Sequence, residues 1–225
     1  MTLTRDYLQS GLLQKMIAQS GLGLYVLSEA ELQESICQTL KRQKPNSDIW
    51  LFAYGSLIWN PIFRFVEHRV GTIYGFHRRF CLWAPLGRGT PDNPGLVLGL
   101  DKGGSCRGIA YRIPAADVVS ELLLLWRREM VIGSYIPTWV KVFDGQQVVE
   151  AIAFVVNRTH SGYAGNISFE TTVTSIATAN GELGSSADYL LQTVDGLNTV
   201  GIKDKQLLRL RQAVIAKTGA RDSSL

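Results

Sequence analysis

A glutamate near the end of a helical segment is the residue of this chain best placed for chemistry. Pro114 can open a helix, and residues 115–130 contain neither Gly nor Pro. Val118, Leu122 and Leu125 follow at helical steps, and Glu129 continues the same stripe. Burial on an apolar face and the negative end of the helix dipole both raise a carboxyl pKa, which suits a general base near neutral pH. Glu129 is therefore the candidate base.

The same helix leaves a plainer interpretation open, in which Glu129 ends the helix in solvent or pairs with an arginine. Arg127 and Arg128 precede it, but at the usual rotation per residue they point about 200° and 100° away from the stripe. Helix geometry alone does not choose between these alternatives.

A second candidate is the turn at Tyr54, Gly55, Ser56 and Leu57, where an apolar run breaks and then resumes. A strand ending in Tyr-Gly-Ser presents consecutive backbone N–H groups beyond its end, and glycine permits a positive φ or the close approach of a ligand. Such a turn could hold a carboxylate or carbonyl oxygen. The alternative is an ordinary bulge or tight turn.

Several other kinds of site are missing from the sequence. The glycine-rich stretch at 87–104 lacks the GK[ST] ending of a phosphate-binding loop, and no GxSxG elbow occurs. His68, His77 and His160 have no metal-binding spacing, and the three cysteines form no CxxC pair. We therefore expect neither a metal nor a cofactor.

The elements that must position these residues fall into three groups. Residues 1–45 read as helical, with Ser28 and Glu31 at capping-box spacing. Short apolar segments separated by turn residues then predict strands at 49–54, 69–76, 78–84, 95–100, 106–113, 138–144 and 148–156. Region 162–176 is expected to be mostly loop, Ser185 to cap a helix to about Val194, and Asp204 to cap a last helix to about Lys217.

This order predicts an α+β fold in which a small mixed β-barrel carries flanking helices. The expected organisation is an N-terminal helical extension at 1–45, one domain at 46–218 and a tail at 219–225. A net charge of +4, spread along 225 residues, is too weak to indicate nucleic-acid binding. No apolar stretch is long enough for a membrane span and no signal peptide is evident, so we expect a reduced, cytoplasmic protein.

Seven motifs in family order resemble the ChaC family of glutathione-specific γ-glutamylcyclotransferases. They run from about Asp48 to Leu210 and read FAYGSLIWNP, GFHRRFCLW, RGTPDNPGLVLGLD, GIAYRIP, LLLLWRREM, GSYIPTWV and SADYLLQTVDGLNTVGIKD. The resemblance implies the family's small mixed barrel. It also implies that Tyr54, Gly55, Ser56 and Leu57 cradle a γ-glutamyl group, that Glu129 is catalytic, and that Tyr189 faces the same pocket. Arg78 matches a family arginine that either contacts substrate or supports structure.

The implied substrate is glutathione, whose α-amine attacks its own γ-carbonyl to give 5-oxoproline and cysteinylglycine, a reaction that requires no metal or cofactor. Trp59, Trp83, Arg88 and Tyr135 are candidates for the cysteinylglycine half, although each could instead be a packing residue. Two rivals are a cyclotransferase for other γ-glutamyl amines and a non-catalytic regulator associated with cation transport. The first 45 residues lie outside the resemblance and could serve protein partners, which the sequence does not identify.

Overall fold

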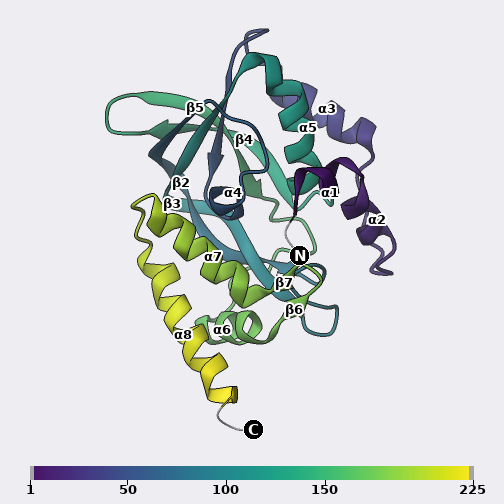
Figure 1. Ribbon diagram of the computed structural model, residues 1–225, viewed down its shortest axis with the longest axis vertical. Helices are drawn as coiled ribbons and strands as arrows, with labels where there is room; N and C mark the ends of the chain where they lie inside the picture. The colour runs from purple at the N-terminus through teal and green to yellow at the C-terminus, as the bar shows by residue number, and fades with distance from the viewer. Residues whose placement is uncertain (1–2, 223–225) are drawn as a thin grey trace.

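The centre of the molecule is a closed barrel of five strands, seen in a computed structural model that describes residues 3–222, with side chains as far as residue 219 (Figure 1). The strands are β1 (Ile49–Ala53), β2 (Glu67–Ala84), β3 (Gly95–Ile113), β4 (Tyr135–Phe143) and β5 (Val148–Val156). Their order is β1-β3-β2-β4-β5, and β1 pairs in parallel with β5 to close the barrel. The predicted α+β barrel with flanking helices is confirmed.

Two long strands replace four short predicted ones. β2 spans the predicted segments 69–76 and 78–84, and β3 spans 95–100 and 106–113; the two pair antiparallel along nearly their whole length. The predicted break near Gly75 is a bulge: its φ is +85° and the register shifts there. A left-handed glycine bends and coils a strand without ending it, so the prediction of separate strands was wrong.

The helix carrying Glu129 packs against the barrel as its apolar stripe predicts. A short 3₁₀ turn, η1 (Ala115–Asp117), follows Pro114 and leads into α5 (Val118–Glu129). The stripe residues Leu122, Leu125 and Trp126 are fully buried. This packing fixes the direction in which the C-terminal end of α5 points.

The N-terminal helices share the core of the barrel domain. They are α1 (Arg5–Gln9), α2 (Leu12–Ala18) and α3 (Glu29–Leu40), and all three lie against α5 (Figure 1). The capping box of Ser28 and Glu31 forms as predicted. Leu8 and Leu32 are fully buried in the common core, so the N-terminal extension packs as part of the fold.

Three further helices cover another side of the barrel (Figure 1). They are α6 (Phe169–Thr178), α7 (Ser186–Thr199) and α8 (Lys205–Asp222), with the two-stranded hairpin β6 (Asn180–Gly181) and β7 (Gly184–Ser185) between α6 and α7. The expectation of mostly loop at 162–176 holds for 162–168 and was wrong from Phe169 onward. Val173 and Ile176 are buried and α6 packs on α7 and α8, which overrides weak local propensity.

The last two helices begin where the caps predict and end later. Ser185 and Asp188 form a capping box, and Asp204 accepts from the N–H groups of Gln206 and Leu207. α7 continues past Val194 and α8 continues past Lys217. Residues 219–222 of the expected tail extend α8, and 223–225 lie outside the described residues.

Candidate active site

The break after β1 is a turn into a one-turn helix, α4 (Ser56–Trp59). Helix geometry leaves the first N–H groups of α4 without intrahelical partners. Gly55 has φ −138°, so it serves close approach rather than a left-handed turn. A Cβ there would lie 3.3 Å from the Tyr189 hydroxyl and 3.6 Å from Leu98 Cδ1. The turn is thus packed tightly against a tyrosine.

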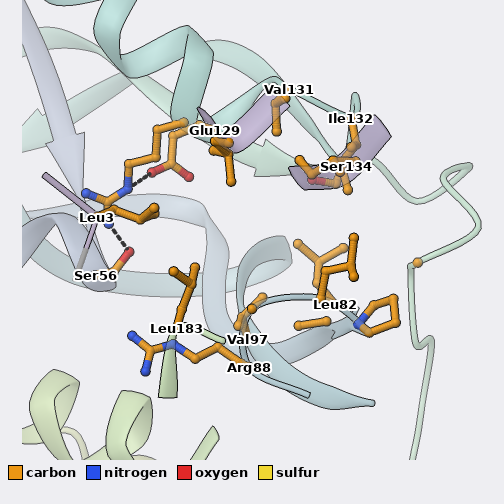
Figure 2. Close-up of a pocket in the computed structure, with 18 of the residues that line it drawn as sticks. Leu3, Ser56, Leu82, Arg88, Val97, Glu129, Val131, Ile132, Ser134 and Leu183 are labelled. Carbon is orange, nitrogen blue, oxygen red and sulfur yellow. Dashed lines mark hydrogen bonds and ion pairs between the residues drawn. The ribbon is translucent and has the colours of Figure 1, made fainter. Parts of the chain in front are cut away.

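Glu129 lies at the last position of α5 and is largely buried, with 13% of its side chain exposed. Burial raises the pKa of Glu129, and the neighbouring Arg128 guanidinium partly opposes that effect. The interpretation in which Glu129 ends the helix in solvent is excluded. Glu129 is both buried and paired with an arginine. The carboxylate points into a cavity (Figure 2).

Arg128 is a site residue that the sequence analysis did not name as a candidate. Its Nε lies 3.1 Å from Glu129 Oε1, and its Nη atoms donate to Ser56 Oγ at 2.7 Å and to the Asn60 carbonyl at 2.9 Å. The rotation of about 100° per residue describes the Cβ direction, but a long arginine side chain reaches around the helix end. Arg127 points away and pairs with Glu29 at the surface. An arginine in the last helical turn next to a candidate base was the available signal.

Three tyrosines line the recess with the carboxylate: Tyr54 and Tyr189 are buried, and Tyr135 is partly buried. The Tyr54 hydroxyl donates to the Phe154 carbonyl at 2.7 Å, and the Tyr135 hydroxyl donates to the Leu98 carbonyl at 2.8 Å. Burial raises the pKa of Tyr54 and Tyr135 well above the usual value and raises the pKa of Tyr189 to about 12. All three phenols are therefore neutral hydrogen-bond donors at physiological pH.

Two adjacent cavities share Ser56, Glu129, Tyr135 and Tyr189 in their walls, and we treat them as the inner and outer parts of one site. The inner recess is lined by Tyr54, Gly55, Ser56, Leu57, Leu98, Glu129, Tyr135, Phe154 and Tyr189. The outer chamber includes Ser56, Glu129, Tyr135 and Tyr189 and extends to Trp59, Trp83 and Arg88. The turn, Glu129 and Tyr189 are thus brought together as predicted, and all four candidates for the cysteinylglycine half line the outer chamber.

Arg78 is separate from both parts of the cavity. Its guanidinium is buried beneath the turn, where it donates to the carbonyls of Tyr54, at 2.7 Å, and Arg107. Its Nε lies 3.0 Å from Asp204 Oδ2. Of the two roles considered from the sequence, these contacts fit structural support.

The remaining side chains offer little nucleophilic or metal chemistry. No cluster of three His, Cys, Asp or Glu side chains suited to a metal occurs among the described residues. Burial raises the pKa of the Cys81 thiol to about 11 and lowers the pKa of His160, whose Nδ1 accepts from the Gly162 N–H. The site is therefore suited to acid–base catalysis on a bound molecule.

Within residues 3–222, every helix is too short or too polar to cross a membrane.

Comparison with solved structures assigns the barrel to the γ-glutamylcyclotransferase fold. A yeast structure, titled as a γ-glutamylcyclotransferase specific to glutathione, matches with a TM-score of 0.70 at 23% identity, covering 77% of this chain and 97% of that chain. The family follows from the sequence comparisons: a family model described as ChaC-like protein matches residues 49–217. The chain belongs to the ChaC-like family, and the resemblance is confirmed.

Two curated relatives are named as glutathione-specific γ-glutamylcyclotransferases. The glutathione-specific γ-glutamylcyclotransferase of Escherichia coli K12 is 38% identical over 207 residues, covering 91% of this chain and 89% of the relative. The human glutathione-specific γ-glutamylcyclotransferase 1 is 32% identical over 188 residues, covering 78% of this chain and 85% of the relative.

Proposed function

We propose that this protein is a glutathione-specific γ-glutamylcyclotransferase that releases 5-oxoproline and cysteinylglycine. The observation that carries the proposal is that Glu129 faces the same inner recess as the N–H groups at the start of α4. The names of the relatives supply the substrate. A reduced cytoplasm is the compartment that fits a substrate with a free thiol.

The chemistry uses a nucleophile that belongs to the substrate. The γ-glutamyl unit folds in the inner recess so that its α-amine attacks its own γ-carbonyl, forming the C–N bond of a five-membered ring. Glu129 takes a proton from the amine and returns one to the leaving amide nitrogen as the old C–N bond breaks. The raised pKa of Glu129 suits both transfers.

The recess supplies hydrogen bonds for the bound glutamyl unit. N–H groups around Gly55 and Ser56 hold its carboxylate or the developing oxyanion, and the Tyr189 hydroxyl donates from the facing wall. The Ser56 hydroxyl already accepts from Arg128, so its role is to position that arginine. Arg78 positions the turn through the Tyr54 carbonyl.

Removal of the base tests the assignment. Glu129→Gln should keep the fold and substrate binding but lower 5-oxoproline formation from glutathione by about 10²-fold or more. Glu150→Gln is the matched control, because Glu150 is half exposed and pairs with Arg42 at the surface. Near wild-type turnover by Glu129→Gln would show that another group is the base.

Substrate comparison separates the two rival functions. We expect more 5-oxoproline from glutathione than from γ-glutamyl-alanine or γ-glutamyl-lysine. Preference for either of the latter would favour a broader cyclotransferase, and no product from any of them would favour the non-catalytic regulator.

A further inference from the structure

The outer chamber has an apolar wall that the proposed reaction does not use. The wall comes from the N-terminal helices, the ends of β2 and β3, and the segments after α5 and β6. Its apolar residues are Leu3, Leu13, Met16, Ile17, Leu24, Leu82, Trp83, Leu86, Val97, Val131, Ile132 and Leu183. Figure 2 shows Leu82 and Ile132 on the side of the chamber away from Ser56.

Glutathione alone does not account for this wall. Apart from the cysteine side chain, its groups are an ammonium, two carboxylates and two amides, and apolar surfaces do not favour such groups. Glu129 and Tyr189 line both parts, so with the γ-glutamyl unit beside Glu129 in the inner recess, we infer that cysteinylglycine extends toward the outer chamber. The cysteine sulfur then faces space bounded by apolar side chains.

The Arg88 guanidinium in the outer chamber suits the glycine carboxylate of glutathione. Arg88 lines the chamber, its guanidinium stacks on the Tyr189 ring at 5.6 Å, and burial lowers its pKa. Arg88 forms no salt bridge among the described residues. One Nη atom donates to the Ser185 carbonyl at 3.3 Å and Asp188 lies nearby, which leaves the other guanidinium N–H groups for the glycine carboxylate. With that end held at Arg88, the apolar wall remains for a substituent on sulfur.

We propose that the protein also cyclises glutathione S-conjugates, in which the cysteine sulfur carries an apolar alkyl or benzyl group. This inference rests on the proposed function. The same ring closure forms the lactam C–N bond and breaks the amide bond, and the proton from the amine goes to the leaving nitrogen. The thioether is untouched, so the products are 5-oxoproline and S-substituted cysteinylglycine.

The N-terminal segment, in its helices and in the residues between them, supplies much of the wall. Leu3, Met16 and Leu24 line the chamber, yet they precede the family match, which begins at residue 49. The segment is tied to the site because Asn60 Nδ2 donates to the Leu3 carbonyl at 2.9 Å, while Arg128 donates to the Asn60 carbonyl. Selectivity for the sulfur substituent is thus contributed from outside the matched region.

The test measures kcat/KM for 5-oxoproline release from glutathione and from its S-methyl, S-butyl and S-hexyl derivatives. Each buried methylene is worth up to about fourfold in affinity, so partial burial should make S-hexylglutathione about tenfold better than S-methylglutathione. Conjugates that bind as inhibitors without releasing 5-oxoproline would overturn the inference, as would a kcat/KM that falls with chain length. The measurement with glutathione itself separates failure of this inference from failure of the proposed function. If glutathione gives no 5-oxoproline, the proposed function is refuted.

A charge placed in the wall sharpens the test. Met16→Glu should reduce the S-hexyl to S-methyl ratio about tenfold. Leu12→Glu, at an exposed position one turn earlier in the same helix that does not line the chamber, should leave that ratio unchanged. Leu183→Asn on another part of the wall provides a second variant should Met16→Glu fail to fold. An unchanged ratio in both wall variants would place the sulfur substituent elsewhere.

Discussion

Arg78→Met should lower the stability of the folded protein and leave its affinity for substrate little changed. The guanidinium is 5% exposed and joins three groups: the Tyr54 carbonyl, the Arg107 carbonyl and the Asp204 carboxylate. Methionine keeps the length of the apolar stem but leaves both carbonyls without this donor. The change therefore separates the supporting role of Arg78 from direct contact with substrate.

The expected loss follows from these contacts. Hydrogen bonds to a charged group contribute about 1.5–3 kcal/mol each, and Arg78 makes one to the buried Tyr54 carbonyl and one, partly buried, to the Arg107 carbonyl. Asp204 is 21% exposed and keeps the N–H groups of α8, so its separation from Arg78 adds little. We expect about 3–5 kcal/mol in total, or a fall in Tm on the order of 10 °C for a chain of this size.

The assay pairs thermal unfolding with kinetics on glutathione at a temperature where the variant is folded. A positioning role predicts a lower Tm and a lower kcat, because the carbonyl of Tyr54 precedes the turn, with KM little changed. Arg107→Met is the control, since Arg107 is exposed and lines the same surface cavity as Arg78, apart from the active site. An unchanged Tm together with a KM raised tenfold or more would refute this reasoning and make Arg78 a substrate contact.

Three further changes test the site and its support. Because burial raises the pKa of Glu129, the folded state holds that proton more tightly than the unfolded chain, so this contribution is present at low pH and is lost as pH rises. Glu129→Gln should thus have a Tm at least equal to that of wild type at neutral pH. The difference in Tm should disappear below the ordinary glutamate pKa, where both side chains are neutral. A lower Tm for the variant at neutral pH would contradict this. Gly55→Ala places a Cβ 3.3 Å from the Tyr189 hydroxyl and should lower kcat/KM by about tenfold or more with little change in Tm, as 5-oxoproline release and calorimetry would show. Arg5→Gln leaves the buried Glu121 carboxylate with the Arg64 N–H as its remaining donor and should cost about 2–3 kcal/mol in urea unfolding, less than a fully buried pair because Arg5 is 32% exposed. Recovery of stability in the double variant Arg5→Gln, Glu121→Gln would confirm that the unpaired charge is the cause.

The features readable from the sequence are those set by local periodicity. The stripe of α5 placed Glu129 on the buried face, and the capping boxes at Ser28 and Ser185 gave two helix starts. The turn at Gly55 was recognisable because glycine and serine interrupt an apolar run. Each of these depends on residues within about one helical turn of one another.

The features that escaped depend on long reach or distant packing. Arg128 joins the site through its side-chain length, which a helical wheel does not represent. Gly75 could mark a turn or a bulge, and the choice depends on pairing with β3. α6 is stabilised by contacts with α7 and α8. The apolar wall of the outer chamber depends on where the N-terminal segment that contains Leu3 packs. None of these is a property of a short window.

Two arginines fix the turn from its two ends, and this limits what can recognise the substrate. Arg78 holds the Tyr54 carbonyl on the β1 side, while Arg128 holds the Ser56 hydroxyl and the Asn60 carbonyl at the two ends of α4. Both charges are already matched by carboxylates, Asp204 and Glu129. The turn and the base are therefore held by one connected set of contacts. In the proposed reaction, the anionic groups of the substrate are met by the N–H groups of the turn and by Arg88. In the proposed reaction the inner recess holds the glutamyl end, and Arg88 in the outer chamber meets the glycine end.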